Sequence, residues 1–243
     1  METPTPLFIL KNLVFQHHMS PMKIGTDALL LGAYTKKIGD KSKILEIGSG
    51  CGIISIMTAR LHPNIHITCL DIDQKACIEC QTNLALNKLT NRSEVICSDL
   101  NKLGDEFLKF DIIISNPPFF TSQMKPNEPK STRAKHTTDL TLNQLSDAVA
   151  KLLLYEGKFY VILPVDEGKL LKDYLEKYGI FLTEKVEIKS LNDKEVFRNI
   201  LVFEKTMSPS DLILKQLTLY NSTQRNDWSE DYKQLLQDFK NFN

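Results

Sequence analysis

One carboxylate and three glycines lie where a predicted strand beginning at Lys43 meets the helix that follows it. The segment LEIGSGCG places Glu46, Gly48, Gly50 and Gly52 at this junction. Glycines let the backbone turn tightly and approach a ligand, and the N-terminus of the next helix offers unpaired N–H groups. The spacing is ExGxGxG rather than the dinucleotide pattern GxGxxG, and its acid would repel a pyrophosphate. The acid suits a ligand with a cationic end, although the glycines alone also fit a plain strand-to-helix turn.

Two further acids end the next two predicted strands. Asp71 ends the second strand, where a carboxylate can accept hydrogen bonds from both ribose hydroxyls. Ser98 and Asp99 end the third strand and can accept a hydrogen bond from an adenine amino group. The carboxyl ends of successive strands meet in the crevice where doubly wound sheets bind ligands. S-adenosylmethionine, which carries a sulfonium, an ammonium, a ribose and an adenine, matches this set of groups.

Strands and helices alternate from Lys43 onward and position these residues. The strand patterns are KILEIGS, NIHITCLDID, SEVICSD, FDIIISN and GKFYVILP, followed by FLTEKVEIKS and NILVFEK as an antiparallel pair. The helical patterns are CGIISIMTARLH, QKACIECQTNLALNKL, TLNQLSDAVAKLLLY and DEGKLLKDYLEKYG. This alternation predicts an α/β fold, a Rossmann-like doubly wound sheet that is mostly parallel. We expect one domain over 1–243, with an N-terminal hairpin and helix extension (1–42), a Rossmann-like core (43–205) and a C-terminal strand and helix extension (206–243).

Composition narrows the class of protein. The 243 residues include 30 Lys plus Arg and 30 Asp plus Glu, so there is no global basic field, although a local basic patch remains compatible with nucleic-acid binding. The five cysteines are odd in number and lie mostly in apolar segments, which indicates reduced thiols. Cys77 and Cys80 form a CxxC, but its helical setting and the lack of a second pair at a zinc spacing favour a core role over metal or redox chemistry. The start METPTPLFIL lacks the features of a signal peptide, and no apolar run is long enough for a membrane span. We expect a cytoplasmic monomer that binds no metal.

The ordered set of motifs resembles the class I S-adenosylmethionine-dependent methyltransferases. The resemblance runs from about Thr26 to Asn116 and includes ExGxGxG, the acids after the second and third strands, and NPPF after the fourth. It implies a seven-stranded sheet whose last strand is antiparallel. It also implies that the three glycines shape the methionine end of the cofactor pocket and that Asp71 holds the ribose. By the same resemblance, Ile72 covers an adenine face and Asp99 contacts the adenine edge.

The stretch FDIIISNPPFF carries the expected catalytic residues. In the family it resembles, NPP followed by Phe or Tyr marks methylation of amino groups on planar amides or nucleobases. The Asn116 side-chain oxygen and the Pro117 carbonyl can accept hydrogen bonds from both amino N–H groups and so aim the nitrogen lone pair at the methyl group. Asn116 is also expected to border the cofactor. Pro117 and Pro118 fix the turn, and Phe119 can stack on a base. The alternative is that the motif only ends a strand and places its aromatic rings in the core.

The N-terminal segment FQHHMSPMKIGTDALLLGAY narrows the substrate. It resembles bacterial tRNA adenosine-N6 methyltransferases that modify adenosine 37 of valine tRNA, as do RAKHTTDL and WSEDYKQLLQDF. The resemblance implies that Thr26 and Asp27 lie over the methionine end of the cofactor. Three alternatives stay open. Guanine-N2 rRNA methyltransferases share NPPF but commonly continue with a histidine where Phe120 stands, and protein glutamine-N5 methyltransferases share NPPY but carry a large preceding helical domain. The third is a non-catalytic RNA-binding relative.

A basic loop follows the NPPF motif. Between Thr121 and Thr138 it holds four cations against the single acid Glu128, namely Lys125, Lys130, Arg133 and Lys135. A local positive excess next to a substrate site fits contacts with tRNA phosphates. The alternative is an ordinary solvated loop.

Overall fold

The fold is described from a computed structural model. The structure describes residues 7–39, 42–104, 107–118 and 140–242. Phe119 and the four cations of the basic loop therefore lie outside the described residues, and their roles stay predictions.

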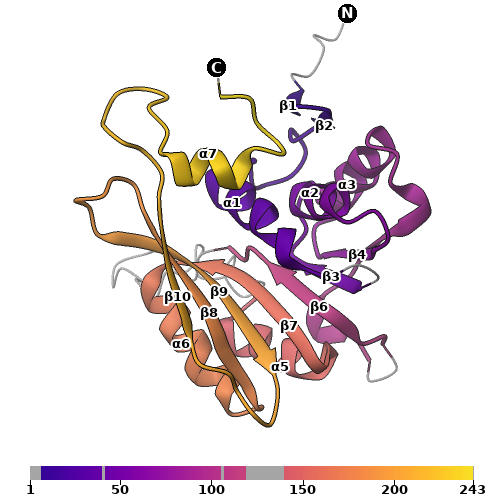
Figure 1. The fold of residues 1–243 in the computed structure, drawn as a ribbon. Coiled ribbons are helices and arrows are strands. Elements are labelled where there is room, and N and C mark those ends of the chain that lie inside the picture. The colour runs from indigo at the N-terminus through magenta and orange to yellow at the C-terminus, as the bar shows by residue number, and fades with distance from the viewer. Residues whose placement is uncertain (1–6, 40–41, 105–106, 119–139, 243) are drawn as a thin grey trace, which may run out of the picture.

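A twisted central sheet organises the described part of the chain (Figure 1). Its strands, in chain order, are β3 (Lys43–Ile47), β4 (His66–Asp71), β5 (Ser93–Cys97), β6 (Phe110–Ser115), β7 (Leu153–Leu163), β8 (Ile180–Lys189), β9 (Val196–Lys205) and β10 (Ile213–Thr218). Their order across the sheet is β10-β8-β9-β7-β6-β3-β4-β5. Among these described strands, β9 alone runs antiparallel to its neighbours. The carboxyl ends of β3, β4, β5 and β6 therefore share one edge, as the sequence predicts.

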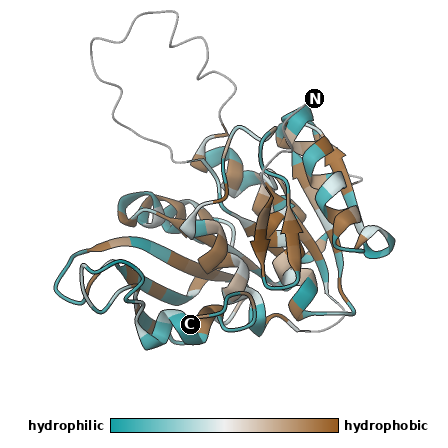
Figure 2. Cartoon of the chain, turned by 90° about the horizontal axis from the view of Figure 1, so that it is seen from above, coloured by the Kyte–Doolittle hydropathy of each residue, from teal (hydrophilic) through white to brown (hydrophobic). Residues whose placement is uncertain are grey.

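Helices cover both faces of this sheet. One face is packed against α1 (Thr26–Tyr34), α2 (Ile53–Leu61), α3 (Gln74–Leu86) and α7 (Glu230–Leu236). The other is packed against α5 (Leu142–Leu152) and α6 (Val165–Glu176). Figure 2 shows that the strands between these layers are mostly hydrophobic, as expected of parallel strands buried on both faces. Short 3-10 turns are η1 (Thr35–Lys37), η2 (Thr90–Arg92) and η3 (Leu100–Lys102), and a small hairpin joins β1 (Phe8–Leu10) and β2 (Leu13–Phe15).

Local sequence explains where key helices begin. Asp73 precedes α3, and its carboxylate accepts a hydrogen bond from the Ala76 amide at 2.8 Å. Thr141 precedes α5 and exchanges hydrogen bonds with Gln144, which forms a capping box. Such caps satisfy N–H groups that the first turn of a helix leaves unpaired, and each stabilises the helix by about 1 kcal/mol.

The predicted fold class is confirmed, but the strand count is wrong. A seven-stranded sheet is expected, whereas the described sheet has eight strands, because the strand expected in the C-terminal extension, β10, joins it by pairing in parallel with β8 from Ile213↔Glu184 to Thr218↔Lys189. Without β10, the outer edge of β8 would expose unpaired backbone groups. The antiparallel pair at this end is confirmed as β8 and β9, with β9 inserted between β7 and β8. No helix in the described ranges combines the length and apolar character needed to cross a bilayer.

Candidate active site at the carboxyl edge of the sheet

The glycine loop between β3 and α2 has one packed side and one open side. Gly48, Gly50 and Gly52 all have positive φ angles, of 72°, 53° and 81°, a region that strongly favours glycine. A Cβ added at Gly48 or Gly50 would meet no atom of residues 7–39, 42–104, 107–118 or 140–242 within 4 Å. A Cβ at Gly52 would lie 2.6 Å from the Sγ of Cys80 on α3. The first two glycines therefore border open space, and Gly52 serves the packing of the loop against α3.

Glu46 lies beneath this loop, inside the protein. It is 1% exposed, and its Oε2 accepts hydrogen bonds from both the amide (2.9 Å) and the hydroxyl of Ser55 on α2. Burial, aided by the nearby Asp71 charge, raises the pKa of Glu46 to about 8 against the opposing effect of the Ser55 hydrogen bonds. Glu46 thus fixes the start of α2, and its contact with a cofactor stays a prediction.

The acid after β4 is tied to the glycine loop. Asp71 Oδ2 accepts a hydrogen bond from the Gly50 amide at 2.7 Å, and Oδ1 accepts one from the Asp73 amide at 2.9 Å. Ile72 beside it leaves 58% of its surface exposed, so an apolar face borders the carboxylate. Asp99 follows β5 and accepts hydrogen bonds from the Asn101 amide and side chain at 2.9 and 3.1 Å. The structure brings Glu46 and Asp71 close together and places Asp99 at the end of the next strand, β5.

The residues predicted to lie over the methionine end begin α1. Thr26 is exposed, and Asp27 accepts a hydrogen bond from Nε of Arg198 at 3.0 Å. Arg198 comes from β9, so this partly buried ion pair joins the N-terminal extension to the sheet. Arg198 could not be predicted as a partner of Asp27, because it lies 171 positions away along the chain.

The cap after β6 presents a buried acceptor. Asn116 is 9% exposed, and its Oδ1 has no hydrogen-bond partner among the residues that the structure describes. Pro117 is buried and Pro118 is exposed. A buried carbonyl oxygen without a donor costs about 1–3 kcal/mol, so this atom is poised to accept a hydrogen bond from a ligand. The Ser49 hydroxyl in the glycine loop is also buried and finds no partner in the described part of the chain.

These residues fit S-adenosylmethionine. Gly48 and Gly50 leave room along the backbone, and Asp71 and Ile72 pair a carboxylate with an apolar surface, as a ribose and an adenine require. Within the part of the chain that the structure describes, no group of three or more His, Cys, Asp or Glu residues could hold a metal ion.

Comparison with known proteins assigns the family. The pattern of the methyltransferase small domain matches residues 10–162. The tRNA1(Val) (adenine(37)-N6)-methyltransferase of Phocaeicola vulgatus is 34% identical and covers 97% of this chain and 98% of its own. Its counterpart from Parabacteroides distasonis is 31% identical and covers 96% of this chain and 97% of its own. This chain belongs to the methyltransferase small domain family.

Solved structures support the fold of this methyltransferase. A predicted O-methyltransferase from Agrobacterium tumefaciens has a TM-score of 0.65 at 15% identity and covers 87% of this chain and 96% of its own. The 16S rRNA N2 G1207 methyltransferase of T. thermophilus, solved with AdoMet and guanosine, has a TM-score of 0.59 at 19% identity and covers 82% of this chain and 49% of its own. The predicted resemblance to methyltransferases is confirmed.

Proposed function

We propose that this enzyme transfers the methyl group of S-adenosylmethionine to N6 of adenosine 37 in a tRNA, with valine tRNA as the substrate. Two observations support the substrate: the N-terminal resemblance and the relatives that match nearly the whole chain, which are named for this reaction. A base in an anticodon loop is unpaired, so moving it into a pocket costs less than flipping one out of a duplex. The proposal places the enzyme in the cytoplasm, acting as a monomer on tRNA.

The observation that supports the chemistry is the buried Oδ1 of Asn116, which lacks a hydrogen-bond partner within the described ranges. An exocyclic amino group on a purine is a poor nucleophile because its lone pair is delocalised into the ring. Asn116 Oδ1 and the Pro117 carbonyl accept hydrogen bonds from the two N–H groups of this amino nitrogen and draw it toward tetrahedral geometry. Its lone pair then points out of the ring plane. The burial of Asn116 excludes water from this acceptor, and the two prolines hold it in place.

The cofactor supplies an electrophilic methyl group on a sulfonium when it is bound. Asp71 would hold the ribose hydroxyls, while Ile72 covers the adenine and Asp99 accepts from its edge. Thr26, Asp27 and the open sides of Gly48 and Gly50 would border the methionine end. Phe119 and the cations Lys125, Lys130, Arg133 and Lys135 remain proposed contacts for the base and the tRNA phosphates.

A methyl-labelling assay with separate candidate substrates tests the reaction and its substrate together. Purified protein is given methyl-labelled S-adenosylmethionine with tRNA, rRNA or a protein release factor, and the modified nucleoside is identified by mass spectrometry. Label in N6-methyladenosine of tRNA is expected. Label in rRNA N2-methylguanosine or in release-factor glutamine would overturn the substrate, and no label in any arm would favour a non-catalytic RNA-binding relative.

Two variants test the cap. Asn116→Ala should abolish methyl transfer while cofactor affinity changes little, because the acceptor of the amino hydrogens is lost. Ser115→Ala is the matched control, since it removes a buried hydrogen bond from the preceding residue to the Ile47 carbonyl, at 2.9 Å, without touching the acceptor. Retained activity in Asn116→Ala would refute the proposed role of the cap.

A further inference from the structure

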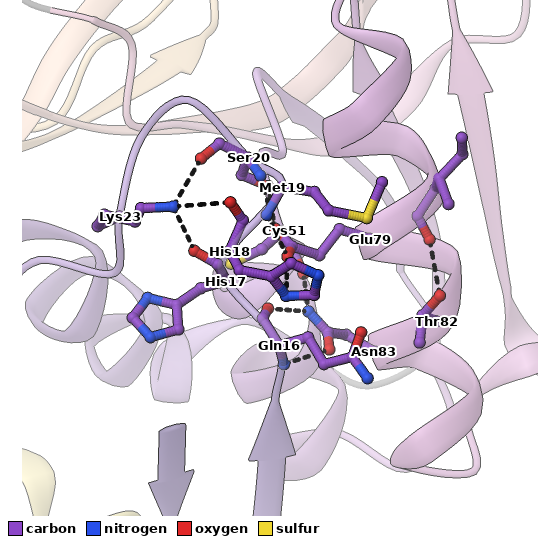
Figure 3. Close-up of polar contacts among 11 residues, drawn as sticks. Gln16, His17, His18, Met19, Ser20, Lys23, Cys51, Glu79, Thr82 and Asn83 are labelled. Atoms are coloured by element: carbon purple, nitrogen blue, oxygen red, sulfur yellow. Dashed lines mark hydrogen bonds and ion pairs between the residues drawn. The ribbon is translucent and has the colours of Figure 1, made fainter. Parts of the chain in front are cut away.

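A polar stripe on α3 holds the segment that leads from β2 to α1. Glu79, Asn83 and Asn87 recur every four residues, so they lie on one face of the helix. Glu79 and Asn83 are completely buried. All three side chains bind backbone atoms of the N-terminal segment, as Figure 3 shows for Glu79 and Asn83.

Asn83 and Asn87 each hydrogen-bond to both backbone groups of one residue in the N-terminal segment. Asn83 Oδ1 accepts from the Gln16 amide at 2.7 Å, and its Nδ2 donates to the Gln16 carbonyl at 2.8 Å. Asn87 Oδ1 accepts from the Val14 amide at 3.1 Å, and its Nδ2 donates to the Val14 carbonyl at 2.8 Å. Each asparagine side chain thus makes the pair of backbone hydrogen bonds that a residue of a neighbouring β-strand would otherwise make.

Glu79 extends the grip toward α1. Its carboxylate accepts hydrogen bonds from the Met19 amide (2.8 Å), the Ser20 amide (2.9 Å) and the Ser20 hydroxyl (2.5 Å). Burial alone would raise its pKa, but these hydrogen bonds outweigh burial and lower it, so the group stays ionised. Lys23 then donates to the carbonyls of His17 and His18 at 2.8 and 3.0 Å, which closes the loop just before α1.

Only Asn83 also reaches the glycine loop. Its Nδ2 donates a second hydrogen bond, at 2.8 Å, to the carbonyl of Cys51. The corresponding second bond of Asn87 goes to the Asn83 carbonyl within α3. Cys51 stands between Gly50, whose amide binds Asp71, and Gly52, which packs on Cys80. One side chain therefore fixes both the N-terminal segment and the packed side of the loop.

We propose that Asn83 is a positioning residue for the cofactor and couples docking of residues 14–20 to the shape of the glycine loop. The inference rests on the proposed function only in that the open side of this loop receives S-adenosylmethionine. Because coupling between two binding events is reciprocal, cofactor binding tightens the N-terminal segment to the same extent that the docked segment favours the cofactor.

Matched variants of the two asparagines test this role. Affinity for S-adenosylhomocysteine is measured by calorimetry for the wild type, Asn83→Ala and Asn87→Ala, together with their unfolding midpoints in urea. Asn83→Ala should bind at least tenfold more weakly, while Asn87→Ala stays within twofold although it also loses its grip on β2. In methyl transfer, Asn83→Ala should raise KM for the cofactor and leave kcat at saturation near the wild-type value. Equal affinities for the two variants would overturn the proposal.

A measurement on the wild-type protein keeps the test independent of variant folding. Hydrogen exchange of the Val14 and Gln16 amides is followed with and without S-adenosylhomocysteine, and the Gln16 amide should exchange more slowly when the ligand is bound. Unchanged exchange at saturating ligand would overturn the coupling. Wild-type protein that binds the ligand but methylates no tRNA would refute the proposed substrate alone, whereas protein that does not bind the ligand would overturn both.

Discussion

Replacement of Glu46 by glutamine should remove a pH dependence of stability that the buried carboxyl creates. In the folded protein its pKa is raised to about 8 from an ordinary value of 4.5, chiefly by burial. Between these values the unfolded chain has released the proton and the folded chain retains it. The unfolded state therefore binds fewer protons, and stability falls as pH rises through this window.

The magnitude follows from the width of the window. Each pH unit between 4.5 and 8 lowers the free energy of unfolding by about 1.4 kcal/mol, so the stabilisation is complete below 4.5 and about 5 kcal/mol is lost by pH 8. Glutamine keeps an oxygen that can accept from the Ser55 amide and hydroxyl but has no proton to lose. The variant should therefore lack this slope.

Urea unfolding at pH 5.5, 6.5 and 7.5 measures the effect for both proteins. From pH 5.5 to 7.5 the free energy of unfolding of the wild type should fall by about 3 kcal/mol more than that of Glu46→Gln. This range spans two pH units, and each contributes about 1.4 kcal/mol. Parallel stability curves would show that the carboxyl is already ionised in the folded protein and would refute the reasoning from burial.

Four further substitutions probe the loop, the cofactor acid and a helix cap. Gly52→Ala should lower the free energy of unfolding by about 2–5 kcal/mol, measured by urea denaturation, because the new Cβ would meet Cys80 Sγ at 2.6 Å in a left-handed backbone. Gly50→Ala should cost only about 1–2 kcal/mol but weaken S-adenosylhomocysteine binding at least tenfold in calorimetry, because its Cβ enters open space; unchanged affinity would place the cofactor elsewhere. Asp71→Asn should likewise raise cofactor KM at least tenfold in the methylation assay, with failure to do so removing this acid from the site. Thr141→Ala should lower stability by about 1 kcal/mol in the same denaturation assay and leave cofactor KM unchanged.

Much of the fold could be predicted because its signals are local. The apolar runs and their polar ends place β3, β4, β5 and β6 and bring the acids and Asn116 to one edge. The glycine spacing indicates left-handed backbone, which all three positions adopt. A strand was expected in the C-terminal extension, but its place in the sheet could not be predicted, because β10 has a mostly exposed pattern and joins the sheet only through its pairing with β8.

The missed residues act across long distances in the sequence. Asn83 lies 32 positions from Cys51, and Arg198 lies 171 positions from Asp27. An asparagine on a predicted helix and an arginine near a strand end are ordinary surface residues until the fold brings a partner beside them. Gly52 could be predicted in part. Its positive φ follows from the residue type, but its contact with the Cys80 sulfur on α3 could not be predicted from the sequence.

The grip of α3 on the N-terminal segment reads main-chain atoms only at Val14 and Gln16. Amide and carbonyl groups are the same for nearly every amino acid, so these contacts place no demand on which side chains the segment carries. Substitutions at these two positions can therefore accumulate without loosening the attachment. Elsewhere in the segment side chains do matter, since Phe15 is buried in the core and the Ser20 hydroxyl donates to Glu79, so tolerance of substitution should be confined to Val14 and Gln16.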